Sequence, residues 1–287
     1  MIYLSHIDFP DNEAEMGFRW RIQETCYSTA YPFFILSKHC LEMIDFDTIT
    51  VLYGSNGSGK STALNVIAER LRAKRDALFN KTNFYRQYLK MCKLAFNSAA
   101  TPAEIRIITS DDVFEFMLNL RAINQGIDVK REELFSDYFA ARDTRGFRMR
   151  SLDDYEKLKE INEARSNTKS QFVKNRLGAN IREQSNGESA QMYFTEKIQD
   201  GGLYLLDEPE NSLSPERQLE LKAFIEEAAQ ERDCQIIMAT HSPFLLSVRG
   251  AKIYDLDADP VDVKKWTELP NIRTYKEFFD QHADEFR

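Results

Sequence analysis

The sequence predicts an α/β fold: a mixed sheet with a parallel core, an antiparallel N-terminal β part and a helical insertion. Two apolar segments, Leu203–Leu206 and Gln235–Thr240, flank a helical segment, which is the strand–helix–strand pattern of a parallel sheet covered by helices. A third apolar segment, Thr48–Tyr53, runs into a glycine cluster, as expected of a buried strand that feeds a loop. The residues before it form short aromatic and β-branched segments, which favour strands joined by turns.

The N-terminal part is predicted to hold three short strands, with an acidic break at Asp8–Glu15. These strands are Met1–Ile7, Phe18–Thr25 and Tyr31–Leu36. After the glycine cluster, Ser61–Leu78 is predicted to be an amphipathic helix, because its apolar residues recur at the spacing of one helix face. Those residues are Leu64, Ile67, Ala68 and Leu71.

The middle of the chain, from Arg75 to about Ile198, is mostly helical in pattern, charged and poor in glycine. Within it, Glu104–Thr109 alternates like a strand and ends at Ser110-Asp111-Asp112, a good start for a helix. Beyond it, Ser214 and Pro215 open the helix between the two apolar strands, and a last strand is predicted at Ala251–Leu256. We therefore expect one domain over 1–287, with a helical subdomain inserted at approximately 76–200.

Composition and charge exclude several classes of protein. The 287 residues include 38 Lys and Arg against 46 Asp and Glu, a net charge of −8, so a surface built throughout to coat nucleic acid is not expected. The four cysteines lack CxxC spacing, so neither a zinc site nor a disulfide framework is predicted. The N-terminus lacks the pattern of a signal peptide, and no apolar run reaches the length of a membrane span. We expect a cytoplasmic protein without membrane insertion.

The glycine cluster carries a phosphate-binding motif. Gly54–Ser61 reads GSNGSGKS, an instance of G-x-x-x-x-G-K-[ST] between a predicted strand and a predicted helix. Such a loop points its backbone N–H groups at phosphate oxygens, Lys60 would reach the β- and γ-phosphates, and the Ser61 hydroxyl would ligate Mg²⁺. The sequence therefore predicts that ATP is bound by Gly54, Ser55, Asn56, Gly57, Ser58, Gly59, Lys60, Ser61 and Thr62.

Two carboxylates end the strand at Leu203–Leu206. A strand buried on both faces would deliver Asp207 and Glu208 to the carboxyl end of the sheet, beside the phosphate loop. There Asp207 would hold Mg²⁺ together with Ser61, and Glu208 would act as the general base that polarises an attacking water. An apolar run that ends in two acids is by itself an ordinary strand end; the preceding phosphate loop gives it this interpretation.

Taken in order, the motifs resemble those of an ABC-type ATPase of the P-loop NTPase class. They are the phosphate loop, SNGES at 185–189, LLDEPE at 205–210, ENSLS at 210–214 and THS at 240–242. The resemblance implies that two chains sandwich ATP as an ATP-dependent homodimer. It implies that His241 contacts the γ-phosphate, although a lone histidine at a strand end is more often structural. It also implies that a signature segment acts in trans, formed by Ser185, Asn186, Gly187, Glu188 and Ser189.

The DEPEN form of the acidic strand end resembles the soluble RecF/SMC-like and OLD-like branches, here grouped with the AAA family, which serve DNA repair and bacterial defence. Two family features match less well. The position after Glu104–Thr109, where the family has a glutamine, holds none, and Gln87 and Gln125 are the nearest. Tyr31 or Phe33 is either the aromatic that stacks on adenine or a core residue.

A basic segment in the middle of the chain does not by itself identify the binding partner. Arg165–Arg182 holds five basic residues and no acidic one. It is a DNA or RNA contact, a solvated helix face, or charge that helps to align the dimer. Two functions follow: an ATPase in DNA maintenance or phage defence, or a nucleotide-gated switch subunit of a transporter or effector complex. Because the chain is expected to hold one ATPase domain only, an effector protein encoded nearby is the expected partner.

Overall fold

Two compact units make up the chain in the computed structural model, which describes residues 1–19, 29–79, 81–97, 100–144, 155–174, 176, 186–211 and 213–286. The first unit comprises Met1–Phe114 and Asn186–Arg287, and the second comprises Glu115–Ser185. The second unit lies within the interval of about 76–200 that the sequence assigns to an inserted subdomain. The boundaries of that subdomain stay a prediction.

The first unit is built around a six-stranded sheet with the order β5-β6-β7-β3-β8-β9. Its first five strands are parallel, and β9 pairs antiparallel with β8 at the edge. The strands are β3 (Ile49–Tyr53), β5 (Ile105–Thr109), β6 (Leu203–Asp207), β7 (Gln235–Ala239), β8 (Lys252–Asp255) and β9 (Asp262–Lys264). Every residue of β3 and β7 is buried, as expected of central strands covered on both faces.

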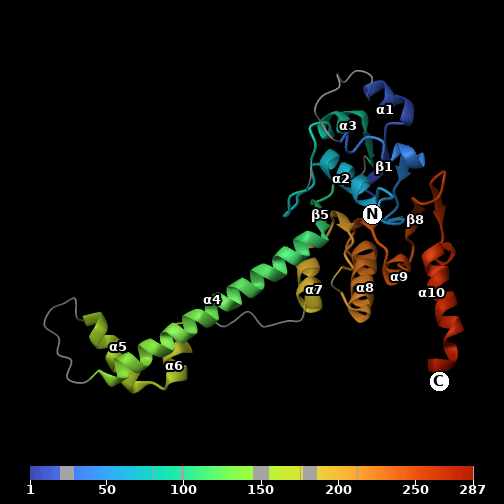
Figure 1. Cartoon of the computed structure of the whole chain (residues 1–287). Coiled ribbons are helices and arrows are strands. Elements are labelled where there is room, and N and C mark those ends of the chain that lie inside the picture. The colour runs from blue at the N-terminus through green and yellow to red at the C-terminus, as the bar shows by residue number, and fades with distance from the viewer. Residues whose placement is uncertain are drawn as a thin grey trace. The chain divides into compact units, whose positions relative to one another are not determined.

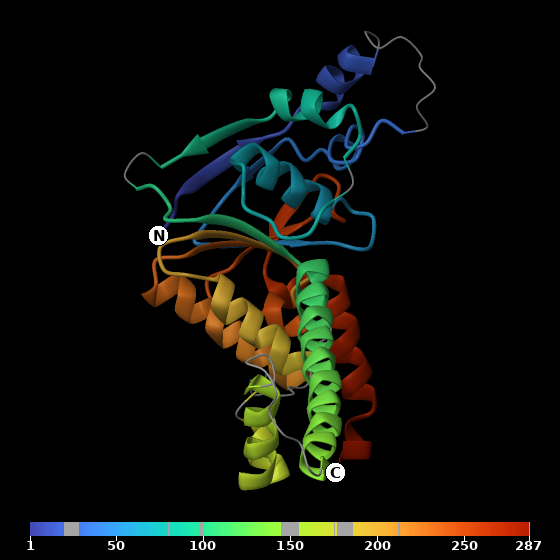
Figure 2. The ribbon, with the colours of Figure 1, turned by 90° about the vertical axis from the view of Figure 1, so that its left-hand side faces the viewer.

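Helices cover both faces of this sheet. Figures 1 and 2 show α2 on one face and α8 on the other, with α7 beside α8. The helices of this unit are α1 (Asn12–Arg19), α2 (Lys60–Leu71), α3 (Tyr85–Met91), α7 (Asn186–Lys197), α8 (Pro215–Glu231), α9 (Pro243–Leu246) and α10 (Pro270–Gln281). The predicted start of α8 is confirmed: Ser214 is the N-cap, its side chain accepts from the Arg217 N–H, and Pro215 follows.

A second, antiparallel sheet lies on the α2 side (Figure 2) and has the order β2-β1-β4. Its strands are β1 (Leu4–Asp8), β2 (Met43–Asp45) and β4 (Lys93–Phe96). Gln235 joins it to the large sheet, because the Gln235 Oε1 accepts from the N–H groups of Tyr3 and Leu4, both at 2.8 Å. The predicted mixed sheet, with a parallel core and an antiparallel N-terminal part, is confirmed.

Three N-terminal expectations change. The strand predicted at Tyr31–Leu36 is wrong, because these residues form turns in which Phe34 has a left-handed backbone with φ of +62°. Phe18 belongs to α1, and residues 20–25 lie outside the described part of the chain. The strand β4 falls in a region predicted to be helical.

The second unit is helical in its described part. It holds most of α4 (Ser110–Asp143), α5 (Tyr155–Ser166) and α6 (Lys169–Lys174). Its apolar cluster is formed by Leu134, Tyr138, Ala141, Ile161, Ala164, Phe172 and Val173. Across the described residues of both units, no helix has the length and hydropathy that crossing a bilayer requires.

Candidate active site

The phosphate loop connects β3 to α2 and folds around a lysine. The Lys60 ammonium donates to the carbonyl oxygens of Gly54 at 2.8 Å and Ser55 at 3.0 Å. Helix α2 begins at Lys60, so its first N–H groups and the positive end of its dipole lie at this loop. Backbone amides of this kind at the start of a helix bind anions, and a phosphate chain is the natural ligand.

Two glycines of the loop have no space for a side chain. A Cβ at Gly59 would lie 2.9 Å from Leu36 Cδ2, and the backbone there has a φ of +96°. A Cβ at Gly54 would lie 2.5 Å from Ser58 Oγ. The turns at residues 31–36 and the loop itself therefore require glycine at these two positions.

An aspartate from another strand anchors the loop. The Asp257 carboxylate accepts from the Ser55 N–H at 2.7 Å and from the Ser55 hydroxyl at 2.8 Å. Asp257 follows β8, and β8 is the neighbour of β3 in the sheet, so the sheet brings these distant residues together. The sequence analysis did not assign Asp257. An acid that follows a predicted buried strand was the available signal.

Asp207 and Ser61, the two predicted Mg²⁺ ligands, lie in contact. Asp207 ends β6, and the Ser61 hydroxyl donates to its Oδ1 at 2.9 Å. Burial, with the charge of Glu208, raises the pKa of Asp207 to about 6, although the hydrogen bond from Ser61 and the charge of Lys60 lower it. One carboxylate and one hydroxyl side by side fit Mg²⁺, which takes oxygen ligands and usually receives the others from phosphate and water.

Glu208 stands at a sharp corner after β6. Its backbone has a φ of +48°, and its N–H donates to the Ala239 carbonyl at 2.9 Å, which ties the corner to β7. The Asn211 amide donates to Glu208 Oε2 at 3.0 Å, and His241 Nε2 lies 3.8 Å from Oε1. Among the described residues, His241 Nε2 is buried with no hydrogen-bond partner. The structure thus brings the two predicted catalytic residues together.

Glu210 holds the turn that carries His241. Its Oε1 accepts from Thr240 Oγ1 at 2.7 Å, from the His241 N–H at 2.7 Å and from the Ser242 N–H at 3.1 Å. Three donors on one oxygen fix the backbone from which the imidazole projects. Glu210 lies within the motif LLDEPE, but the sequence alone predicted no role for it.

Negative charge surrounds Lys60. Burial lowers the pKa of Lys60, while Glu208, Asp257, Asp207 and Glu210 oppose this effect. Four carboxylates and one ammonium leave this end of the sheet with an excess of negative charge. A polyphosphate would therefore enter most favourably together with a divalent cation.

The described part of the chain includes only some of the predicted signature segment. Ser185 lies outside it, as do the side chains of Asn186 and Glu188, which with Gly187 form the backbone of the first turn of α7. Ser189 is buried. Their role in trans stays a prediction.

The structure describes the residues at the positions where the sequence matches the family less well. Phe33 is a core residue, 4% exposed and stacked on Phe18 with ring centroids 4.5 Å apart. Tyr31 is half-buried, and burial raises its pKa while a hydrogen bond to Thr62 lowers it. Gln87 and Gln125 are exposed. Asp112 occupies the position after β5 and accepts from the Thr109 N–H at 2.6 Å.

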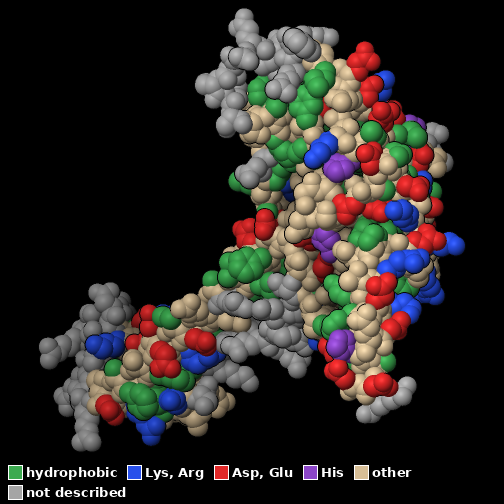
Figure 3. Space-filling view, turned by 45° about the vertical axis from the view of Figure 1, so that its right-hand side comes forward, with side chains coloured by type: hydrophobic (Ala, Val, Ile, Leu, Met, Phe, Trp, Pro, Cys, Tyr) green, Lys and Arg blue, Asp and Glu red, His purple; other side chains and the backbone are tan. Residues whose placement is uncertain are grey.

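The basic segment belongs to the second unit, and its described side chains are engaged within that unit. Arg176 pairs with Glu163 at 2.8 Å, and Lys169 lies 3.9 Å from the centroid of the Phe135 ring. Arg165 donates to the Thr144 carbonyl at 2.5 Å. Acidic, basic and apolar side chains are interspersed on the face of this unit that Figure 3 shows. Arg182 lies outside the described residues.

Solved structures resemble this chain weakly. A dimeric ATP-binding cassette in a post-hydrolysis state with ADP and Pi is 14% identical with a TM-score of 0.40, covering 94% of this chain and 100% of that one. The Smc head domain of Pyrococcus furiosus, with an extended coiled coil and bound to the C-terminal domain of ScpA, is 15% identical with a TM-score of 0.36, covering 82% and 94%. A putative metal-chelate type ABC transporter in an inward-facing conformation is 14% identical with a TM-score of 0.35, covering 81% and 80%.

Comparison of the sequence with protein families identifies the family of this chain. A family described as AAA domain, putative AbiEii toxin, Type IV TA system, matches residues 194–247. A search of curated proteins found no match. The ABC transporter family matches residues 43–211, more than half of the chain, from the strand before the phosphate loop to just beyond the acidic pair. The chain therefore belongs to the ABC transporter family and is an ABC-type P-loop ATPase.

Proposed function

We propose that this ATPase requires Mg²⁺ and hydrolyses ATP as a head-to-tail dimer with two nucleotides between two chains. One observation carries the proposal: Ser61 and Asp207 are in contact at the phosphate loop, with Glu208 and His241 beside each other at the next corner. Mg²⁺, when bound, would neutralise phosphate charge between Ser61 and Asp207. The remaining chemistry falls to side chains of this chain.

Each side chain has a role that its surroundings support. The loop amides and Lys60 bind and orient the phosphates. Glu208, held by Asn211, accepts the proton of the attacking water, which removes the need for free hydroxide. The unpartnered Nε2 of His241 is available to a γ-phosphate oxygen, and Glu210 keeps the ring in place. The signature segment of the second chain, 185–189, would complete the γ-phosphate contacts.

The variant Glu208→Gln tests the dimer. It keeps the shape of the side chain and the contact with Asn211 but cannot accept the proton, so it should bind ATP, stop hydrolysis and remain a dimer. Light scattering with ATP and with ADP measures this, and Glu227→Gln, an exposed residue of α8, is the matched control. A variant that binds ATP yet stays monomeric would refute the sandwich.

For the cellular role, we propose phage defence or DNA maintenance, with an effector protein as partner. The match of residues 194–247 to a family described as a putative toxin of a type IV toxin–antitoxin system supports the defence role. The basic segment Arg165–Arg182 remains the proposed site for DNA or RNA. ATPase rates with and without DNA, at increasing salt, test this contact, because phosphate contacts weaken steeply with salt.

The alternative is a nucleotide-gated switch subunit of a transporter or effector complex, which the ABC transporter match favours. The two roles differ in what stimulates hydrolysis. Stimulation by DNA that is lost in Arg165→Glu with Lys169→Glu supports the first role. Stimulation only by a purified partner protein, with no effect of DNA, supports the second.

A further inference from the structure

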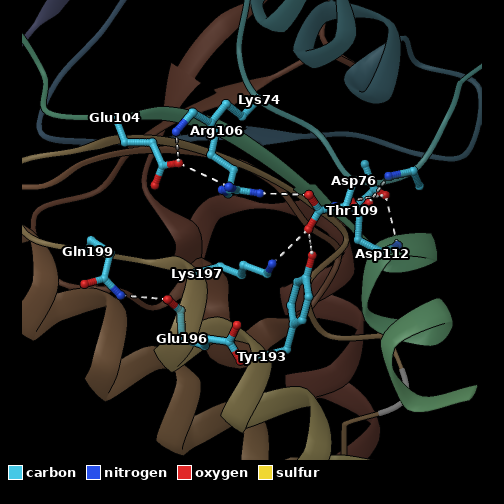
Figure 4. Close-up of polar contacts among 11 residues, drawn as sticks. Lys74, Asp76, Glu104, Arg106, Thr109, Asp112, Tyr193, Glu196, Lys197 and Gln199 are labelled. Carbon is cyan, nitrogen blue, oxygen red and sulfur yellow. Dashed lines mark hydrogen bonds and ion pairs between the residues drawn. The ribbon is translucent and has the colours of Figure 1, made fainter. Parts of the chain in front are cut away.

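A network of charged and polar side chains joins helix α7 to the core of the first unit. Asp76 is its centre, in the segment that follows α2 (Figure 4). The Asp76 carboxylate accepts from Arg106 Nη1 at 3.0 Å, from the Tyr193 hydroxyl at 2.8 Å and from Lys197 Nζ at 3.1 Å. Arg106 belongs to β5, whereas Tyr193 and Lys197 lie four residues apart on α7.

The backbone segment that carries Asp76 is held against the core of the first unit. The Lys74 N–H donates to the Ile105 carbonyl at 2.8 Å, and the Ile107 N–H donates to the Lys74 carbonyl at 2.9 Å, so this segment runs along β5. The buried Asp112 carboxylate accepts from the Ala77 N–H at 2.5 Å and also from the Thr109 N–H. Thr109 is the register partner of Asp207, so Asp76 is connected to the strand end that carries the proposed Mg²⁺ ligand.

Two side chains of α7, Tyr193 and Lys197, contact the Asp76 carboxylate. Tyr193 is 3% exposed, and removal of Asp76 would take away an acceptor of its hydroxyl. Burial, followed by the hydrogen bond to Asp76, raises the pKa of Tyr193, and the phenol therefore stays a donor. The pKa of Asp76 is lowered, against the effect of burial, by Tyr193 and Lys197. On its other side α7 contacts α8, where Arg217 donates to Gln191 at 3.0 Å.

This attachment is one of the contacts that hold the direction of α7. The helix begins at Asn186, in the signature-like segment, and Tyr193 lies about 10 Å further along its axis. A tilt of about 15° around the Asp76 contact would move the first turn by about 3 Å, which is the length of a hydrogen bond. The position of that first turn relative to a partner's nucleotide is therefore sensitive to this single carboxylate.

We infer that Asp76 is a positioning residue for ATP-dependent dimerisation: it holds α7 so that the segment at its start can meet the nucleotide of a second chain. This inference rests on the proposed sandwich dimer. Asp76 does not touch the phosphate loop in the contacts described above, and its side chain is 43% exposed. Removing Asp76 takes an acceptor away from a buried hydroxyl of α7, so we expect it to disturb the orientation of α7 more than the rest of the fold.

The test measures two quantities separately: the affinity of one chain for nucleotide, and the association of two chains. In Asp76→Ala we expect the Kd for a fluorescent ATP analogue to change less than about twofold. The protein concentration that gives half-maximal ATPase activity should rise by about tenfold or more, equivalent to about 1.4 kcal/mol. Asp76→Glu should restore part of the activity. Asp200→Asn, which alters an exposed aspartate paired with Arg232 just beyond α7, is the control and should behave as the wild type.

Light scattering gives the second readout, in the Glu208→Gln background with ATP. The double variant Glu208→Gln, Asp76→Ala should stay monomeric where Glu208→Gln alone forms a dimer. If both dimerise alike, the role of Asp76 is refuted and the sandwich stands. If Glu208→Gln alone is monomeric, the proposed dimer itself is refuted. Tyr193→Phe with Lys197→Met leaves Asp76 in place; wild-type association in this variant would also overturn the inference.

Discussion

At the scale of single residues, Asp207 is the carboxylate of the proposed Mg²⁺ site. Its carboxylate is partly buried at the end of β6 beside two further acids, and its raised pKa means that the metal-free protein tolerates this charge poorly. A pKa raised from 3.8 to about 6 corresponds to about 3 kcal/mol of folding free energy. A folded-state pKa above the unfolded one favours the protonated acid, so stability falls as the pH rises from about 4 to about 6.

Asp207→Asn should therefore stabilise the metal-free protein while it abolishes Mg²⁺-dependent hydrolysis. Asparagine keeps an oxygen that accepts from Ser61 and removes the charge. We expect the increase in Tm to be largest near pH 8 and to shrink towards pH 4, where the wild-type carboxyl is largely neutral. Thermal melts in EDTA across this range measure it. An equal change in Tm at both ends of the range would contradict the assigned cause.

At the scale of elements, the phosphate loop is held by a residue that follows another strand, as well as by hydrogen bonds within the loop. Asp257, which follows β8, accepts two hydrogen bonds from Ser55. A hydrogen bond to a charged group contributes about 1.5–3 kcal/mol when sheltered and less when exposed, as here. This anchor should reduce the conformational freedom of the loop before the nucleotide binds.

Asp257→Ala should raise KM for ATP by about threefold to tenfold and leave kcat almost unchanged, because the anchor orders the loop without touching the reacting atoms. Removal of a negative charge near Lys60 acts in the opposite direction. Asp257→Asn separates the two effects: it keeps an acceptor for Ser55 and loses the charge, so its KM should be below that of Asp257→Ala. Steady-state kinetics measure both, with exposed Asp259→Ala as the control.

The elements also show what could be predicted from sequence. The strands β3, β6 and β7 are mostly apolar runs that end at or just before a glycine or a polar residue, and such local patterns predict buried parallel strands. Tyr31–Leu36 has similar composition but forms turns, because the Phe34 N–H donates to the buried carboxylate of Glu15 at 2.5 Å. No local pattern contains that contact, since tertiary structure supplies the acceptor.

The same limit applies to the candidate site. The loop at 54–62 and the acidic pair were predictable, because short motifs encode them and the order of a parallel sheet brings their ends together. Asp257 and Asp76 were not predicted. Each acts on a residue far away in the sequence, and each depends on which strands become neighbours in the sheet.

At the scale of the whole molecule, the net charge of −8 and the division into two units limit where a nucleic acid could bind. A nucleic acid would have to bind at a local basic area, and Arg176, Lys169 and Arg165 of the basic segment already contact Glu163, Phe135 and Thr144. Binding there would replace these contacts, so affinity should be modest and strongly dependent on salt.

The corner at Glu208 limits the stability of the molecule as a whole. A residue with a side chain in a left-handed backbone costs about 1–2 kcal/mol relative to glycine, so the fold tolerates the proposed general base in a conformation that glycine would adopt freely. Glu208→Gly should therefore melt at a higher temperature than Glu208→Gln while both are inactive, and calorimetry of the two compares them. Selection for thermal stability alone would favour glycine here, and an inactive ATPase would be the result.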